Sequence, residues 1–240
     1  MMERVLVIRD NITLVIQGPM NTHMGSLRRG ILYIPYYSKL VKNIVVSSWK
    51  QNPKDVKMSK RFMREHSVKH VDDEEKNYEG HLNQGNVSLQ VATTLNGLKL
   101  VETEYVIKVR CDEYYENLDK VIETLENNPD QLITSEPFYR TNQIDRYAIS
   151  DHVMAAQTVK MRDMLEKAQY FCKNACDEIR ETDMAPEEIM RQFFDGQNTR
   201  VSMEHFGKFF FNISGRTLTQ KNYAEYRKQH NKVVKSLAEV

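Results

Sequence analysis

The sequence lacks several features that would place it in a well-defined class of proteins. Its apolar residues never reach the roughly 18 in succession that a membrane-spanning helix needs. The first ten residues contain the short apolar run 5–8 and no small-residue cleavage site, which argues against a secretory signal. The three cysteines, Cys111, Cys172 and Cys176, are odd in number and form no CxxC pair. We therefore expect a cytoplasmic protein with reduced thiols and neither a disulfide framework nor a zinc site.

A charge excess of either sign is also missing. The 34 Lys and Arg residues nearly balance the 33 Asp and Glu residues, so the net charge is +1. Proteins that bind nucleic acid through its phosphates have a strong basic excess, so we expect no nucleic-acid partner. The chain has no P-loop, GxGxxG turn, GxSxG elbow or HExxH helix. These absences argue against P-loop hydrolases, Rossmann dehydrogenases, serine hydrolases and zincins.

The chain does contain apolar, strand-like runs that alternate with segments of helical spacing. This alternation predicts an α/β fold with a mostly parallel, Rossmann-like central sheet and helices on both faces, as a single domain over 1–240. Strands are expected at 11–17, 43–48, 68–71, 105–110, 131–135 and 146–156, and the segment 201–213 is expected to contain an aromatic strand. Helices are expected at 26–42 with a kink at Pro35, 86–100, 118–127, 160–176, 186–194 and 223–237.

The turn after the first expected strand is the first candidate site, because open parallel sheets bind ligands beyond the carboxyl ends of their strands. Gln17, Gly18 and Pro19 form this turn. Glycine permits a ligand to approach the backbone, and the Gln17 amide can donate and accept hydrogen bonds. The alternative is a turn that only ends the strand.

Charged residues follow the expected strand 105–110. Adjacent carboxylates such as Asp112 and Glu113 can hold Mg²⁺ or Mn²⁺ together with substrate phosphates. Arg110 could neutralise a diphosphate through bidentate hydrogen bonds. The alternative is a solvated turn with a local Arg–Glu pair.

Further acidic residues and histidines are candidates for proton transfer or metal binding. Asp151 and His152 fall within an expected apolar strand, where they either transfer a proton or satisfy each other by a hydrogen bond. Glu187 and Glu188 open an expected helix, where carboxylates also favour the helix dipole. His205 is either a packed histidine of the aromatic strand or a metal ligand.

Six segments in this order carry a resemblance to a known family: Val15-Ile16-Gln17-Gly18-Pro19, Ile44-Val45-Val46-Ser47-Ser48-Trp49, Asn86 with Gln90 and Gly97-Leu98, Tyr105-Val106-Ile107-Lys108-Val109-Arg110-Cys111-Asp112, Ser150-Asp151-His152-Val153-Met154, and Pro186-Glu187. Over about residues 12–211, the chain resembles the WavE-type lipopolysaccharide-synthesis family of GT-A-type glycosyltransferases. The resemblance implies a GT-A-like domain with a nucleotide-binding half (1–110), a donor and acceptor half (111–215) and a basic C-terminal helix (216–240).

The resemblance further implies an enzyme that moves a sugar from a nucleotide-diphosphate sugar to a glycan or glycolipid acceptor, assisted by Mn²⁺ or Mg²⁺. The implied roles are nucleotide-sugar binding by Gln17, Gly18, Pro19, Asn86, Gln90 and Arg110, metal binding by Asp112 with Glu113 or His205, and proton abstraction by Asp151, with Glu187 and Glu188 as other candidates. The chain departs from the family at Arg110, where many GT-A enzymes have the first Asp of an Asp-x-Asp motif. It also has Leu89 where the family tends to show a basic residue.

Two other functions remain open at this point. The missing first Asp is compatible with a non-catalytic nucleotide-sugar-binding module, and transfer of a sugar phosphate is a third possibility. The basic residues of the expected last helix are either a solvated face or a contact with an acidic membrane surface, where glycolipid acceptors reside. They are Lys221, Arg227, Lys228, Lys232 and Lys235.

Overall fold

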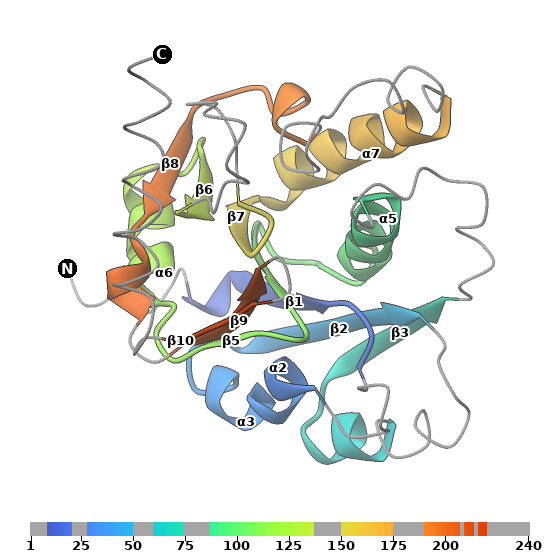
Figure 1. The fold of residues 1–240 in the computed structure, drawn as a ribbon, viewed down its shortest axis with the longest axis vertical. Helices are drawn as coiled ribbons and strands as arrows, with labels where there is room; N and C mark the ends of the chain where they lie inside the picture. The colour runs from blue at the N-terminus through green and yellow to red at the C-terminus, as the bar shows by residue number, and fades with distance from the viewer. Residues whose placement is uncertain are drawn as a thin grey trace.

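The structure is a computed structural model, and it describes residues 9–20, 28–49, 60–73, 87–136, 150–174, 190–206, 209–213 and 216–219. A central sheet runs through the molecule, with α5 (Val87–Leu98) and α7 (Thr158–Asn174) on one side and α2 (Arg29–Leu32) and α3 (Ile34–Tyr37) on the other (Figure 1). Within the described part of the chain, no helix is both long and apolar enough to span a membrane.

The central sheet has seven strands in the order β3-β2-β1-β4-β7-β6-β8. Only β7 runs antiparallel to its neighbours, and every other neighbouring pair is parallel. The prediction of a mostly parallel α/β sheet with helices on both faces is therefore confirmed. The strands are β1 (Ile12–Gln17), β2 (Asn43–Trp49), β3 (Lys69–Asp73), β4 (Tyr105–Arg110), β6 (Leu132–Ser135), β7 (Val153–Gln157) and β8 (Asn198–Val201).

A smaller sheet, the helix α6 and a 3-10 helix also belong to the described residues, and residues 60–65 and 190–192 are helical as well. The small sheet has the order β10-β9-β5, with β5 (Tyr114–Tyr115), β9 (Phe209–Ile213) and β10 (Arg216–Thr219). The helix α6 spans Asp119–Asn127, and the 3-10 helix η3 spans Met203–Phe206. The strand β5 directly follows the loop after β4, so the small sheet begins next to the carboxyl edge of the large one.

Both faces of β1 are buried, because helices cover the sheet on each side. Leu14 and Ile16 pack into the core under α2, α3 and α6, whereas Val15 packs into the core under α5 and α7. Successive side chains of a strand point to opposite faces. Gln17 therefore lies on the Val15 side, at the end of β1 that faces α5.

Three of the expected elements differ from the structure. The helix expected at 26–42 is two short helices that meet at Tyr33, with Pro35 in the first turn of α3, where its missing N–H costs nothing. The aromatic strand expected within 201–213 is β9, which begins only at Phe209 and lies in the small sheet, whereas β8 ends at Val201 in the large one. The strand expected at 146–156 begins only at Val153, as β7. Residues 137–149 lie outside the described residues. The last helix, expected at 223–237, also lies outside them.

Candidate functional site

The turn after β1 lies directly against the loop after β4. The Cys111 N–H donates to the Gln17 carbonyl oxygen at 2.8 Å, and the Cys111 thiol lies 2.9 Å from the Pro19 carbonyl oxygen. Gly18 has a φ of +121°, and a Cβ there would lie 2.7 Å from Cys111 Sγ. Both its conformation and the close approach favour glycine at this position. The two sequence segments predicted to form one site are thus in contact.

The start of α2 packs onto the same loop. The Gly30 N–H donates to the Cys111 carbonyl oxygen at 2.9 Å, and a Cβ on Gly30 would lie 2.4 Å from the Glu113 carbonyl oxygen. This close packing places Arg28, the residue before α2, beside the loop. Its Nη1 lies 3.6 Å from Asp112 Oδ2. Arg28 was not among the residues predicted from the sequence, and a basic residue shortly after a strand-ending turn was the only signal for it.

Arg28, Arg110 and Asp112 form a partly exposed layer of charge. Arg110 donates from Nε to Asp112 Oδ1 and from Nη2 to Asp112 Oδ2, both at 3.2 Å. The side chains of Arg28, Arg110 and Asp112 are 20%, 24% and 18% exposed. Burial by itself raises the pKa of Asp112, but the positive charges of Arg110 and Arg28 outweigh it and hold this pKa below its ordinary value. Asp112 is therefore an ion-paired carboxylate.

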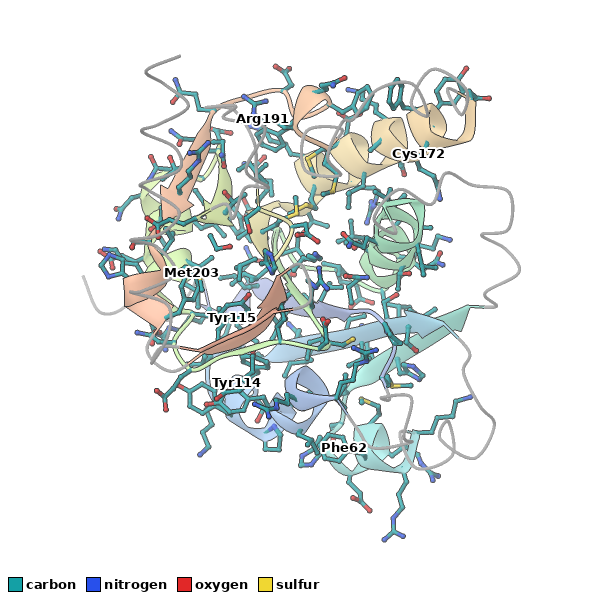
Figure 2. All side chains as sticks on the ribbon, viewed as in Figure 1. Phe62, Tyr114, Tyr115, Cys172, Arg191 and Met203 are labelled. Atoms are coloured by element: carbon teal, nitrogen blue, oxygen red, sulfur yellow. The ribbon has the colours of Figure 1, made fainter. Side chains whose placement is uncertain are left out.

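A second, deeper layer of charge centres on Glu113, which is fully buried. Glu113 Oε1 lies 2.7 Å from His152 Nδ1 and 3.4 Å from Arg110 Nε, and Glu113 Oε2 accepts a hydrogen bond from the Tyr115 hydroxyl at 2.8 Å. Tyr115 belongs to β5 (Figure 2), and its N–H donates to the Tyr37 hydroxyl oxygen at 3.0 Å. Both Glu113 oxygens are thus occupied by side chains of the protein.

Asp151 joins the two layers. Its Oδ2 lies 3.3 Å from Arg110 Nη1, its Oδ1 lies 3.8 Å from His152 Nε2, and its carbonyl oxygen accepts a hydrogen bond from Lys108 Nζ. Burial alone raises the pKa of Asp151, but the charges of His152, Arg110 and Lys108 outweigh burial and hold it well below the usual range. Asp151 and His152 precede β7, which corrects their expected place inside a strand. They reach this site because antiparallel pairing puts Val153 opposite Val109, at the carboxyl end of β4.

Two glutamine side chains on the Val15 side of the sheet have buried acceptor atoms that no described residue pairs. Within the described residues, Oε1 of Gln17 and Oε1 of Gln90 have no hydrogen-bond partner. The helix face that carries Gln90 lies over the sheet, because the Ser47 hydroxyl donates to the Thr93 carbonyl oxygen and a Cβ on Gly97 would lie 3.0 Å from Ser47 Cβ. Buried polar atoms normally have partners, so both acceptors are suited to a donor from outside the described residues, such as a ligand.

Apart from Gln90, the predicted site residues fall into three groups: those at the carboxyl edge of the sheet, one that lies elsewhere, and those outside the described residues. Gln17, Gly18, Pro19, Arg110, Asp112, Glu113 and Asp151 lie at the carboxyl edge of β1 and β4. His205 is an exposed residue of η3, which corrects the interpretation as a packed histidine; the neighbouring Phe206 packs, with its ring 5.1 Å from that of Tyr115. Asn86, Glu187 and Glu188 lie outside the described residues.

The carboxylates predicted as metal ligands are bound to protein groups. Both oxygens of Asp112 contact guanidinium groups, and both oxygens of Glu113 contact His152, Arg110 or Tyr115. Divalent cations such as Mg²⁺ and Mn²⁺ need oxygen ligands that face the ion. Across the described ranges, no three His, Cys, Asp or Glu side chains form a group that could hold a metal ion. As arranged, this donor set does not fit a divalent cation, and metal assistance stays a prediction.

The sequence model of the WavE lipopolysaccharide synthesis family matches residues 12–151. The curated proteins contain no match to the chain. Two solved structures of LgtC are similar in fold: the galactosyltransferase in complex with donor and acceptor sugar analogs, and a mutant altered in its active site. Each has a TM-score of 0.54 at 12% identity and aligns with 79% of this chain, covering 73% and 72% of the respective LgtC chains. A cytidylyltransferase from Leptospira borgpetersenii has a TM-score of 0.47 at 12% identity, with 82% of this chain and 78% of the other covered.

The family match covers more than half of the chain and includes the strands β1, β2 and β4 with their site residues. The likeness to LgtC at low identity concerns the fold, which is that of the GT-A glycosyltransferases. The resemblance seen in the sequence is therefore confirmed. This chain belongs to the WavE lipopolysaccharide synthesis family and has a GT-A-like fold.

Proposed function

We propose that this protein transfers a sugar from a nucleotide-diphosphate sugar to a glycan or glycolipid acceptor. One observation carries the proposal: at the carboxyl edge of β1 and β4, a partly exposed arginine pair adjoins a strand end whose buried amide acceptor has no partner among the described residues. The arginines are Arg28 and Arg110, and the acceptor is Gln17 Oε1. Arginines suit phosphate oxygens, and an unpaired acceptor suits an N–H or O–H donor of a nucleoside.

The residues around the β1 turn would bind the nucleoside part of the donor. The positive φ of Gly18 turns the chain at the end of β1, and Cys111 packs against this turn, which holds Gln17 at the carboxyl edge of the sheet. Gln17 and Gln90 would each accept a hydrogen bond from the base or ribose and so satisfy their buried oxygens. A base with an N–H on its pairing edge, such as uracil or guanine, would satisfy these acceptors.

Departure of a nucleoside diphosphate leaves negative charge on its terminal phosphate. Positive groups already held in position stabilise this charge without reorganising during the reaction. Arg110 is held in this way, because Asp151 and Glu113 contact it from the buried side.

Activation of the acceptor hydroxyl requires a base in an inverting enzyme, and Asp151 is our first proposal for it. Its ion pair with Arg110 makes it a weak base in the ligand-free protein. A diphosphate on Arg110 would offset part of that positive charge and raise the basicity of Asp151. Glu187 and Glu188 remain proposals that rest on the sequence.

A thermal-shift panel tests the proposed function. We expect UDP, GDP, CDP or TDP, with or without Mn²⁺, to raise the melting temperature, since a ligand selective for the folded state stabilises it. The nucleotide released from the matching sugar donor then identifies the reaction, because glycosyl transfer releases a diphosphate and sugar-phosphate transfer a monophosphate. Absence of stabilisation by all four nucleotides in both conditions would refute the proposal.

A non-catalytic nucleotide-sugar-binding module is the second candidate, and the ion-paired state of Asp112 and Asp151 favours it. Donor hydrolysis separates the two functions. A transferase hydrolyses its donor slowly above background, and Asp151→Asn lowers that rate if Asp151 is the base. A module binds the nucleotide sugar, and wild type and variant then hydrolyse it at the same background rate.

A further inference from the structure

Asp112 lies between two arginines that come from different parts of the fold. Arg110 ends β4 and binds both Asp112 oxygens at 3.2 Å, while Arg28 precedes α2 and approaches Asp112 Oδ2 at 3.6 Å. A phosphate group presents oxygens that guanidinium groups bind in the same bidentate manner as they bind a carboxylate. The Asp112 carboxylate therefore occupies a place suited to a phosphate.

The arginines are held independently of Asp112. Arg110 also contacts Asp151 Oδ2 at 3.3 Å and Glu113 Oε1 at 3.4 Å, both on its buried side. The Arg28 N–H donates to the Met20 carbonyl oxygen at 2.8 Å, which ties Arg28 to the segment after the β1 turn. The Arg110 guanidinium and the Arg28 main chain therefore have supporting contacts that persist if Asp112 turns away.

A phosphate can reach the two arginines and displace the Asp112 carboxylate from them. The side chains of Arg28, Arg110 and Asp112 are all partly exposed, whereas Glu113 is fully buried. An incoming phosphate would take over the ion pairs that the Asp112 carboxylate gives up, so neither arginine would lose its counter-charge. A displaced Asp112 carboxylate can be solvated, and the inner contacts of Glu113 with His152 and Tyr115 need not change.

We propose that Arg28 and Arg110 form a diphosphate clamp that works without a divalent cation, and that Asp112 fills the clamp until the diphosphate displaces it. The inference rests on the proposed function, because it states how the same site takes the diphosphate of the donor. It assigns Asp112 a role opposite to that of a metal ligand: the carboxylate competes with the phosphate instead of recruiting it through a cation.

The two roles predict opposite effects of Asp112→Asn on the binding of a nucleoside diphosphate, measured by isothermal titration with UDP and GDP. In excess EDTA we expect wild type to bind, and Asp112→Asn to bind with equal or severalfold higher affinity, because the competing negative charge is gone. Arg28→Gln should bind about tenfold more weakly, the effect of losing one charge-assisted contact. Affinity should also fall with rising salt.

Arg29→Gln is the matched control, since Arg29 is the exposed neighbour of Arg28 and the first residue of α2. It should keep wild-type affinity, and thermal melts of all variants without nucleotide check their folding. Binding that requires Mn²⁺ and disappears in Asp112→Asn would overturn the clamp but leave the proposed function standing. Absence of binding with and without Mn²⁺ would overturn both.

Discussion

Glu113 Oε1 lies 2.7 Å from His152 Nδ1, and both side chains are buried. This contact joins the loop after β4 to the residue before β7, which are 39 positions apart in the sequence. It also holds the imidazole next to Asp151 and Arg110. Stability and site geometry therefore depend on the same pair of side chains.

The buried His152 imidazole predicts that its contribution to the free energy of unfolding falls as the pH rises. Burial lowers the pKa of His152, but the charges of Glu113 and Asp151 outweigh burial and Arg110, and the pKa is raised above its ordinary value of 6.5. A histidine whose pKa is higher in the folded protein than in the unfolded chain stabilises the folded state. This contribution is fully present at a pH below the pKa of the unfolded chain, and it is lost as the pH rises through the pKa of the folded protein.

Urea unfolding of wild type and His152→Gln between pH 6 and pH 9, a window of about three units, measures this loss. The difference in free energy of unfolding between the two proteins should shrink as the pH increases, because only wild type loses the charged imidazole. A difference that is constant or grows with pH would contradict the predicted direction of the pKa change.

Replacement of the buried carboxylate, Glu113→Gln, should strongly destabilise the protein. The change removes the negative charge that faces His152 and Arg110 but retains the side-chain size. Loss of one partner from a buried ion pair typically costs about 3–5 kcal/mol in the free energy of unfolding. Urea denaturation at neutral pH measures this value.

Glu65→Gln is the control for that substitution. Glu65 forms an exposed helical ion pair with Arg61 at 2.8 Å. Exposed pairs of this kind contribute only about 0.3–0.5 kcal/mol. Similar losses in Glu113→Gln and Glu65→Gln would show that the Glu113 network does not contribute as a buried charge pair.

The β1 turn requires glycine, so Gly18→Ala should destabilise the fold by about 1–3 kcal/mol through strain. The positive φ disfavours any Cβ, and the new methyl group would lie 2.7 Å from Cys111 Sγ. A double-mutant cycle with Cys111→Ala separates the two causes. Removal of the sulfur should restore part of the stability, because the contact is relieved while the unfavourable φ remains. Full additivity of the two changes would show that the thiol contact has no role.

Gln17→Leu should separate stability from ligand binding. Replacement of a buried acceptor that has no partner among the described residues is expected to leave the stability equal or to raise it by about 1 kcal/mol. Affinity for a nucleoside diphosphate should fall, since the proposed contact with the nucleoside is gone.

Thr13→Val is the matched change at the other end of the same β1 face. Thr13 is hydrogen-bonded to Thr103 at 2.7 Å, so this variant should lose stability and keep nucleotide affinity. Parallel thermal melts and titrations compare the two variants. A large loss of stability in Gln17→Leu with unchanged binding would assign Gln17 a structural role only.

Much of the sheet was predictable from local sequence patterns. The strand β4 begins and ends at the expected residues, and β1 differs by one residue at its start. Both lie in the middle of the sheet with helices on each face, so their sequences are nearly continuous apolar runs. The aromatic strand expected within 201–213 is present as β9, but no local pattern shows that it leaves the large sheet, because β9 pairs with Tyr114 and Tyr115, which are remote in sequence.

The sequence by itself determined that Gln17, Arg110 and Asp112 meet at one edge, since parallel strands bring their carboxyl ends together. Only the tertiary structure decided the partners of each charge. The sequence does not show that α2 brings Arg28 to Asp112, or that the antiparallel β7 brings His152 to Glu113. Ion pairing depends on distances of a few ångströms between loops, and those distances arise only when helices and strands far apart in the chain pack together.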